Sequence, residues 1–525
     1  MRMIRQIFGI ETACKSFIIK MYLEISAYQN MIIGIITLFL RIERDNMQAQ
    51  TGFLWGGAIS AAQTEGNYLV DGRKMSNFDY LPLNDKRLKP VYLDQEHSIL
   101  NPEKQEIYPS RTAIDFYHTF EEDIKLLSEL GINSFRFSIS WSRIFPTGEE
   151  TEPNQKGLDF YDQIIGELEK YQIEPIVTIS HFDLPFHLVE KYNGWQSRKV
   201  VDLYVHYATT IMTYFKGRIK YWIPFNEMNM VLHIPFIGGG ITFNSKENPL
   251  QIQYQAGHHQ LLANALTIKA GKEINPDAQF GAMLAAGKTY AYTCDPEDVF
   301  AALKSERENL LFSDVQVFGE YPKFTANFFE ENNIQLNVTE QDKHILKENT
   351  VDFVSFSYYS SACTSANQDG LEKVATNGFM TVKNPYLPES TSVWQNDPLG
   401  LRITLNQLYD RYRKPLFIVE NGLGTQDILK GQKIDDEYRI DYLKGHIQNL
   451  LLALNEDGVD LIGYMMWGII DLTSVSEGRI SKRYGVIYVD LDDEGNGTGN
   501  RLKKASYDWY QEVVKTNGAA AFSDY

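Results

Sequence analysis

Short apolar runs alternate with longer amphipathic stretches along most of the chain. From residue 52 onward, each run has the length of a β-strand and is followed by a longer amphipathic stretch. Eight such runs can be counted, at residues 53–61, 134–141, 174–180, 221–227, 278–286, 352–359, 415–421 and 461–468. Strands that alternate with helices in this way predict repeated βα units around a parallel sheet.

The stretch between the first two runs predicts a helix that packs outside this sheet. Its apolar residues recur at helical spacing, at Phe116, Phe120, Ile124, Leu127 and Leu130. Charged residues are predicted on the other faces of the helix, at Glu121, Glu122, Asp123 and Lys125. One apolar face and several polar ones are typical of a helix that covers a sheet.

Eight βα units favour an α/β protein with a (β/α)8 barrel over a doubly wound sheet. The 525 residues are enough for such a barrel with long βα loops. Two polar stretches, 364–384 and 477–499, are predicted as loops of this kind. Since no Pro/Ser-rich linker or repeat divides the chain, we expect residues 47–525 to form one barrel domain.

The first 46 residues differ from the rest. Residues 31–40 are an apolar run, but a membrane-spanning helix needs about 20 apolar residues. A secretory signal is also disfavoured, because Lys15, Lys20 and Glu24 interrupt the approach and no Ala-x-Ala site follows. Met47 lies just before the regular pattern, so residues 1–46 are predicted to be a non-native or disordered extension.

Composition excludes several functional classes. The chain is 43% hydrophobic, as in a globular protein, and its net charge of -18 disfavours nucleic acid as a partner. Cys14, Cys294 and Cys363 are widely separated and show no CxxC pattern. They predict a reduced, cytoplasmic environment and no zinc site. We expect no metal, no redox cofactor and no membrane partner.

Two of the apolar runs end in a carboxylate. Residues 221–227 end at Glu227, and residues 415–421 carry Glu420 next to their end. A barrel gathers the carboxyl ends of its strands around one mouth, so these two side chains are predicted to meet. A lone Glu at a strand end is more often solvated or salt-bridged, but two in matched contexts form the pair that protonates a leaving group and attacks an acetal carbon.

The same segments resemble glycoside hydrolase family 1. Phe225-Asn226-Glu227 is similar to the acid/base motif of that family, and Phe417-Ile418-Val419-Glu420-Asn421-Gly422 to its nucleophile motif. Further similar segments follow in family order: Gln63-Thr64-Glu65-Gly66, residues 135–143, His181-Phe182-Asp183-Leu184-Pro185, Phe356-Ser357-Tyr358-Tyr359 and Met466-Trp467-Gly468. The resemblance extends from residue 53 to about residue 510.

The resemblance implies a retaining double displacement. Glu227 acts as general acid and then as general base, while Glu420 attacks the anomeric carbon. This chemistry needs two carboxyls about 5 to 5.5 Å apart, with the pKa of Glu227 raised and Glu420 ionised. Arg136 and Tyr359 resemble the family residues that hold the nucleophile. Gln63, His181, Asn226 and Trp467 match positions that bind the sugar, and Trp394 is expected at the entrance.

The segment after the eighth run resembles the 6-phospho-β-glycosidase branch. Plain β-glucosidases usually carry Glu at the Ser474 position, where it binds sugar hydroxyls, so no carboxylate is expected to oppose a charged sugar here. Ser474, Lys482 and Tyr484 are the set expected to bind an anion at C6. Val475 is small, as in the phospho-glucosidase group, whereas phospho-galactosidases tend to carry Trp.

These resemblances predict a retaining 6-phospho-β-glucosidase that hydrolyses β-linked 6-phosphoglucosides, with water as second substrate. Phospho-cellobiose, phospho-gentiobiose and aryl phospho-glucosides all remain open as substrates. A β-glucosidase or a 6-phospho-β-galactosidase is the nearest alternative. An inactive sugar-binding barrel is the alternative from another class. The sequence gives no oligomeric state.

Overall fold

The computed structural model describes residues 47–84, 86–94, 99–100, 106–376, 379–388 and 394–523. Residues 1–46, the predicted extension, lie outside the described residues, so that prediction stays a prediction. Among the helices of the described residues, none is both long enough and apolar enough to cross a membrane.

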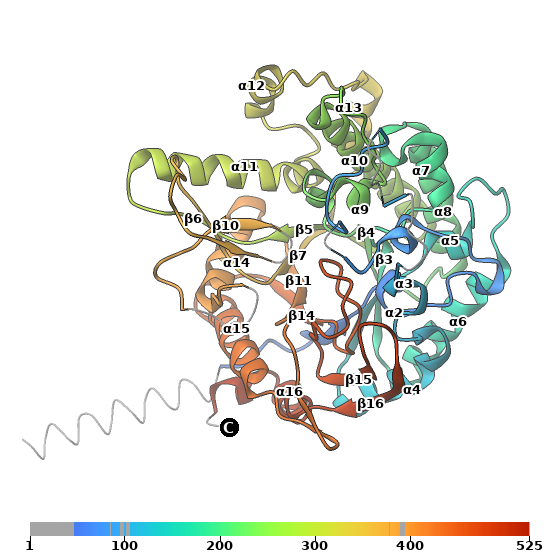
Figure 1. The fold of residues 1–525 in the computed structure, drawn as a ribbon, viewed down its shortest axis with the longest axis vertical. Coiled ribbons are helices and arrows are strands. Elements are labelled where there is room, and N and C mark those ends of the chain that lie inside the picture. Colours follow the sequence, from blue (N-terminus) through green and yellow to red (C-terminus); the bar gives the residue numbers. More distant parts are fainter. Residues whose placement is uncertain are drawn as a thin grey trace, which may run out of the picture.

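Eight parallel strands close into a barrel at the centre of the molecule (Figure 1). In chain order they are β1 (Leu54–Ala58), β2 (Ser134–Ser138), β3 (Glu174–Ser180), β4 (Tyr221–Phe225), β5 (Gln279–Ala286), β7 (Phe353–Tyr358), β11 (Leu416–Asn421) and β14 (Leu461–Trp467). The barrel closes because β1 pairs with β2 on one side and with β14 on the other. The predicted (β/α)8 barrel is confirmed.

The strands could be predicted from the sequence because their residues are buried. All residues of β2, β7 and β11 are buried, and strands covered on both faces are continuously apolar. Two predicted runs, 53–61 and 134–141, extend three residues beyond their strands, and a short helix begins at the last residue of each run. These helices are α2 (Ala61–Thr64) and α5 (Trp141–Ile144).

A long helix follows each barrel strand, and these helices lie around the sheet (Figure 1). They are α4 (Phe116–Leu130), α6 (Gln155–Lys170), α8 (Lys199–Tyr214), α10 (Pro249–Ile274), α11 (Pro296–Phe318), α14 (Pro398–Tyr412), α15 (Glu437–Asn455) and α16 (Ala505–Lys515). The connections also contain α3 (Pro109–Thr112), α7 (Phe186–Tyr192), α9 (Pro235–Gly239), α12 (Phe324–Glu331), α13 (Glu340–Glu348) and the 3-10 helices η1 (Val70–Gly72), η2 (Asn77–Tyr80), η3 (Gly194–Gln196), η4 (Met228–Leu232) and η5 (Ala519–Phe522).

Helix α4 buries the predicted apolar face and one residue that the pattern placed elsewhere. Asp123 is fully buried, so its predicted position on a polar face was wrong. Its Oδ1 accepts a hydrogen bond of 2.8 Å from Nε of Arg501, which lies 378 residues later in the chain. The buried carboxylate is tolerated because a guanidinium pairs with it.

The two stretches predicted as loops contain strands. Residues 364–384 include β9 (Lys373–Ala375) and β10 (Met380–Val382), which pair antiparallel. The stretch begins at the last residue of β8 (Ala362–Thr364), which pairs with β6 (Thr289–Ala291). Residues 477–499 include β15 (Ile487–Leu491) and the start of β16 (Gly497–Lys503), which also pair antiparallel. A further small hairpin joins β12 (Leu429–Lys430) and β13 (Lys433–Ile434). The prediction of plain loops was therefore wrong in both places.

Candidate active site

Glu227 lies two residues beyond the end of β4, at the carboxyl-terminal mouth of the barrel. Its backbone is left-handed, with φ 36° and ψ 60°, and η4 begins directly after it. A residue other than glycine in this region costs roughly 1–3 kcal/mol, and such strain concentrates at functional sites. The hydroxyl of Ser357, on β7, donates a hydrogen bond to Oε1 of Glu227.

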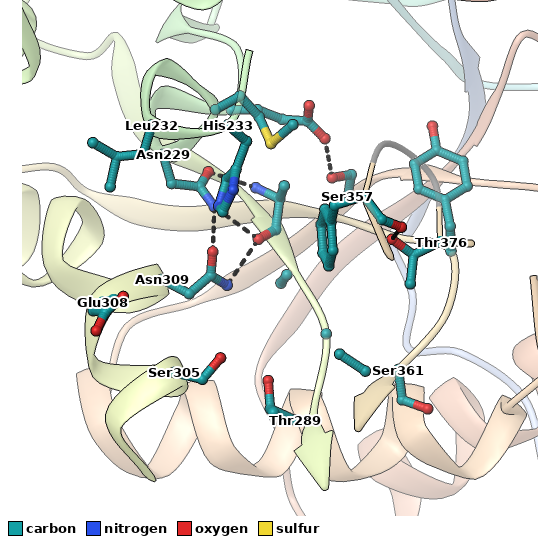
Figure 2. A pocket seen from close by; sticks show the side chains of 18 of the residues that line it. Asn229, Leu232, His233, Thr289, Ser305, Glu308, Asn309, Ser357, Ser361 and Thr376 are labelled. Carbon is teal, nitrogen blue, oxygen red and sulfur yellow. Dashed lines mark hydrogen bonds between the residues drawn. The ribbon is translucent and has the colours of Figure 1, made fainter. Parts of the chain in front are cut away.

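Two asparagines fix the backbone that carries Glu227 (Figure 2). Asn229 donates to the carbonyl oxygen of Ala285 on β5 at 3.0 Å, and the amide of Ala285 donates back to Oδ1 of Asn229 at 2.9 Å. Asn309, on α11, accepts from Asn229 at 2.5 Å and donates to the same carbonyl at 3.1 Å. This network ties η4 to β5 and α11. Sequence reasoning missed it, because the partners come from three separate elements, η4, β5 and α11.

Glu420 lies on β11, where the pairing is irregular. The register shifts between Ile418 and Glu420 against β7 and again before Asn421 against β14. A bulge of this kind redirects a side chain. The carboxyl of Glu420 is buried between two donors: Nη1 of Arg136 at 2.6 Å and the hydroxyl of Tyr359 at 2.8 Å.

Arg136 connects this carboxylate to the rest of the mouth. Its Nη2 donates to Oδ1 of Asn226 at 2.6 Å, and its Nε donates to the hydroxyl of Thr178 at 2.9 Å. One buried guanidinium therefore joins β2, β3, the end of β4 and β11. Its guanidinium forms a salt bridge with Glu420, so Arg136 is the counter-ion of that carboxylate.

The two carboxyls have different protonation tendencies. Desolvation by the surrounding protein and the negative charge of Glu420 raise the pKa of Glu227 to about 8, against the opposing effects of Ser357 and Arg136. Burial also raises the pKa of Glu420, but Arg136 and Tyr359 stabilise its ionised form. The pair therefore holds its proton on Glu227 near neutral pH, leaving Glu420 ionised.

Ser357→Ala is expected to move the alkaline limb of the pH profile of kcat/KM upward by roughly one pH unit. The Ser357 hydroxyl hydrogen-bonds to the ionised carboxylate and so lowers the pKa of Glu227. Without it, Glu227 keeps its proton to higher pH. Ser355→Ala, on the same strand, is the matched control, because the Ser355 hydroxyl donates to the carbonyl oxygen of Ala282 instead. A downward shift, or an equal shift in both variants, would contradict the role of Ser357.

Two adjoining cavities meet at Glu227. The first contains both glutamates and is lined by Gln63, Leu88, His181, Phe182, Asn226, Glu227, Met230, Ile234, Tyr359, Glu420, Trp467, Val475, Ser476 and Tyr484. The second, of about 440 Å³, shares Glu227, Met230 and Tyr359 with the first and extends between η4, β5 and α11. Figure 2 shows His233, Asn309 and Ser361 around this second cavity. A carboxyl at the junction can act on a bond that spans both cavities.

Most of the predicted sugar-binding residues line the first cavity together with the glutamates. Gln63 is fixed from behind, since its Nε2 donates to the carbonyl oxygen of Thr473 at 2.7 Å. His181 stacks on Trp467 with ring centroids 5.4 Å apart. Burial, together with the charge of Arg136, holds the pKa of His181 well below its usual value, so its ring is neutral.

Trp394 does not lie at the entrance, where the sequence placed it. It is 1% exposed and packs behind the cavity wall, against the rings of Tyr359 and Tyr484. The ammonium of Lys482 lies 5.4 Å from the centre of its ring. Direct contact of Trp394 with substrate is therefore not supported; its ring supports residues that line the cavity.

Ser474, Lys482 and Tyr484 meet at the wall of the first cavity, but of the three only Tyr484 lines it, together with Ser476. Tyr484 is hydrogen-bonded to both Ser474 and Lys482. Nζ of Lys482 donates to the Ser476 hydroxyl at 2.9 Å and pairs with Oε1 of Glu477 at 3.0 Å. A carboxylate that the sequence analysis did not consider, that of Glu477, therefore contacts Lys482, while the expectation that none opposes a charged sugar stays a prediction. Sequence reasoning also missed Ser476, which lines the cavity while Lys482 lies just behind it.

A buried ion network fixes the segment that carries Lys482 and Tyr484. Nη1 of Arg439, on α15, donates to the carbonyl oxygens of Arg483 and Tyr484 at 3.2 and 2.9 Å. Arg483 itself turns away from the cavity and pairs with Asp471 at 3.0 Å. Of the three consecutive residues 482–484, Tyr484 lines the cavity and Lys482 hydrogen-bonds to it from behind the lining.

The family model described as "Glycosyl hydrolase family 1" matches residues 46–519. The chain belongs to glycosyl hydrolase family 1. Within this family it is 51% identical to the aryl-phospho-beta-D-glucosidase BglH of Bacillus subtilis (strain 168), over 89% of this chain and 97% of that protein. It is 49% identical to the 6-phospho-beta-glucosidase AscB of Escherichia coli (strain K12), over 89% and 98% respectively.

A solved family 1 structure has the same fold. The family 1 β-glucosidase from Thermotoga maritima superposes with a TM-score of 0.76 at 31% identity, covering 90% of this chain and 98% of that one. Within the described residues, no group of three or more His, Cys, Asp or Glu side chains is arranged to hold a metal ion. The expectation that the enzyme needs no metal or redox cofactor stays a prediction.

Proposed function

We propose that this family 1 chain is a retaining 6-phospho-β-glucosidase that releases glucose 6-phosphate from β-linked 6-phosphoglucosides. The observation that carries the proposal is the cluster of Ser474, Lys482 and Tyr484 at the end of the cavity that holds the two glutamates. The relatives described as acting on phosphorylated β-glucosides support it, at about half of the residues identical.

In the first step, Glu420 attacks the anomeric carbon as the bond to the leaving oxygen breaks. Glu227 gives its proton to that oxygen, which departs as an alcohol or phenol. In the second step, the ionised Glu227 takes a proton from water, and the resulting hydroxide displaces Glu420 from the sugar. Two inversions retain the β configuration. The Arg136 and Tyr359 contacts hold Glu420 in position and keep it ionised.

The sugar phosphate is assigned to Ser474, Lys482 and Tyr484, which offer two hydroxyls and an ammonium. Lys482 remains cationic. Burial lowers its pKa, but interactions with Tyr484 and Glu477 raise the pKa by more than burial lowers it, so the net shift is upward. Val475 lines the cavity beside this cluster, and its small side chain favours the gluco over the galacto epimer. The 440 Å³ cavity beyond Glu227 takes the leaving group, and its size suits a second sugar or an aryl group.

The proposal also places the reaction in the cytoplasm. Cys294 is an exposed free thiol and Cys363 a buried one, whereas Cys14 lies outside the described residues. Unpaired exposed thiols are typical of reducing compartments. The partners are then a phosphorylated β-glucoside and water. The net charge of -18 argues against nucleic acid as a partner.

Hydrolysis of p-nitrophenyl β-glucoside 6-phosphate beside the plain p-nitrophenyl β-glucoside tests the proposal. We expect at least about a hundredfold preference in kcat/KM for the phosphorylated compound, because an ammonium and two hydroxyls meet its charge. The galactoside 6-phosphate is the control for the sugar epimer. Preference for the plain glucoside would favour the β-glucosidase alternative. Absence of turnover on all three would favour an inactive sugar-binding barrel.

A further inference from the structure

All three proton donors of the Lys482 ammonium are engaged within the protein. They contact the Ser476 hydroxyl at 2.9 Å, the Glu477 carboxylate at 3.0 Å and the Tyr484 hydroxyl. An ammonium has three donors and no more. A phosphate oxygen can therefore bond to Lys482 only if one of these three partners gives up its place.

Glu477 is the partner that a phosphate replaces best. Ser476 and Tyr484 are neutral hydroxyls, and each can turn to donate to an anion. Glu477 can only accept, and its negative charge repels a phosphate. Its side chain is 38% exposed, whereas that of Lys482 is 5% exposed, so Glu477 can turn toward solvent while the ammonium stays in place.

The backbone around Glu477 is fixed, so its side chain can move alone. The amide of Gly478 donates to the carbonyl oxygen of Ser474 at 2.8 Å, and the amide of Ser474 donates to that of Arg479 at 3.0 Å. Nε of Arg87 donates to the carbonyl oxygen of Val475 at 2.6 Å. Displacing Glu477 needs a change of side-chain rotamer, not a rearrangement of the turn that forms the cavity end.

We propose that Glu477 is an internal counter-ion of Lys482 and that a sugar phosphate displaces Glu477 when it binds. The competition between Glu477 and the phosphate for Lys482 then sets the selectivity between phosphorylated and plain sugars. This inference rests on the proposed function. With Glu477 in place, the cavity end is electrically neutral and accepts an uncharged C6 hydroxyl. With Glu477 turned out, the end presents a cation to the phosphate. The Glu477 carboxylate therefore reduces the preference for the phosphorylated sugar that Lys482 creates.

Binding of glucose 6-phosphate and of glucose to the wild type and to Glu477→Gln, followed by calorimetry, tests the inference. The ratio of the two affinities should rise roughly fivefold in the variant, in favour of the phosphate, because the competing anion is gone. Glu494→Gln is the matched control: it removes one exposed carboxylate from the turn between β15 and β16, and its ratio should equal that of the wild type.

An unchanged or lower ratio in Glu477→Gln would overturn the inference, because Glu477 would then be irrelevant to the phosphate or would assist its binding. The outcome is separable from the proposed function. If the wild type hydrolyses the phosphorylated glucoside and the ratio does not rise, only the inference fails. If the wild type does not hydrolyse it, the proposed function fails and the inference fails with it.

A double-mutant cycle tests the contact itself. In a Lys482→Ala background, Glu477→Gln should raise the affinity ratio by less than twofold, because the cation for which Glu477 and phosphate compete is absent. The same fivefold gain in that background would overturn the counter-ion role, since Glu477 would then act on the phosphate without Lys482.

Discussion

Glu420→Ala is expected to lower kcat by about 10⁴-fold or more on any substrate that the enzyme cleaves. The variant lacks the carboxylate that we propose as nucleophile, and among the described residues no other carboxylate lines the cavity except that of Glu227, the proposed acid. Added azide or formate should restore part of the activity, because a small anion can occupy the space beside Arg136 and attack in place of the carboxylate.

The product identifies the mechanism. Azide rescue should give a glycosyl azide of α configuration, because one inversion replaces two. Thermal unfolding must be measured in parallel, since removing Glu420 leaves the buried Arg136 without its counter-ion. A folded Glu420→Ala protein that keeps wild-type activity would refute the assignment of the nucleophile, and so would loss of activity that no anion restores.

Glu174→Ala is the matched control. Glu174 begins β3, so its carboxyl lies at the opposite end of the barrel from the mouth. Unchanged activity in Glu174→Ala would agree with the polarity of the barrel, in which catalytic groups lie at the carboxyl ends of the strands. We expect its kcat to remain within about twofold of the wild type, as for substitutions away from the site.

The barrel could be predicted because burial on both faces makes each strand apolar along its whole length. The positions of these apolar runs also placed Glu227 and Glu420 at the mouth, because both lie at the carboxyl end of a run and a barrel gathers these ends at one face. The long polar stretches could not be read in this way. The hairpins β9–β10 and β15–β16 pair locally and carry no continuous apolar run, so they resembled loops.

Local chain geometry around the glutamates was beyond the reach of the pattern. The left-handed backbone of Glu227 depends on the amide network of Asn229 and Asn309, whose members are 80 residues apart. The bulge before Glu420 depends on two neighbouring strands. The Glu477–Lys482 pair is local in sequence, yet its contact depends on a turn whose shape no periodicity reports.

Lys482→Ala is expected to reduce kcat/KM for p-nitrophenyl β-glucoside 6-phosphate by roughly 10²- to 10³-fold. Truncating one partner of a buried charged pair costs about 2–5 kcal/mol. The loss is that of the ammonium's own contact with the phosphate, because the Glu477 side chain, 38% exposed, can turn toward solvent once Lys482 is absent. Hydrolysis of the plain glucoside should fall far less, since its C6 hydroxyl is neutral and keeps Ser476 and Tyr484 as partners.

The change in the ratio of the two substrates separates recognition from folding. Lys482 also packs over Trp394, so a structural defect would lower both activities by the same factor and reduce the melting temperature. Lys503→Ala is the control, because it removes an exposed lysine paired with Glu129 on the outside of the barrel. A ratio that stays at the wild-type value in Lys482→Ala would remove Lys482 from the phosphate site. In that case the proposed retaining mechanism would still stand, because its steps at the anomeric carbon use only Glu227, Glu420 and the groups that fix them.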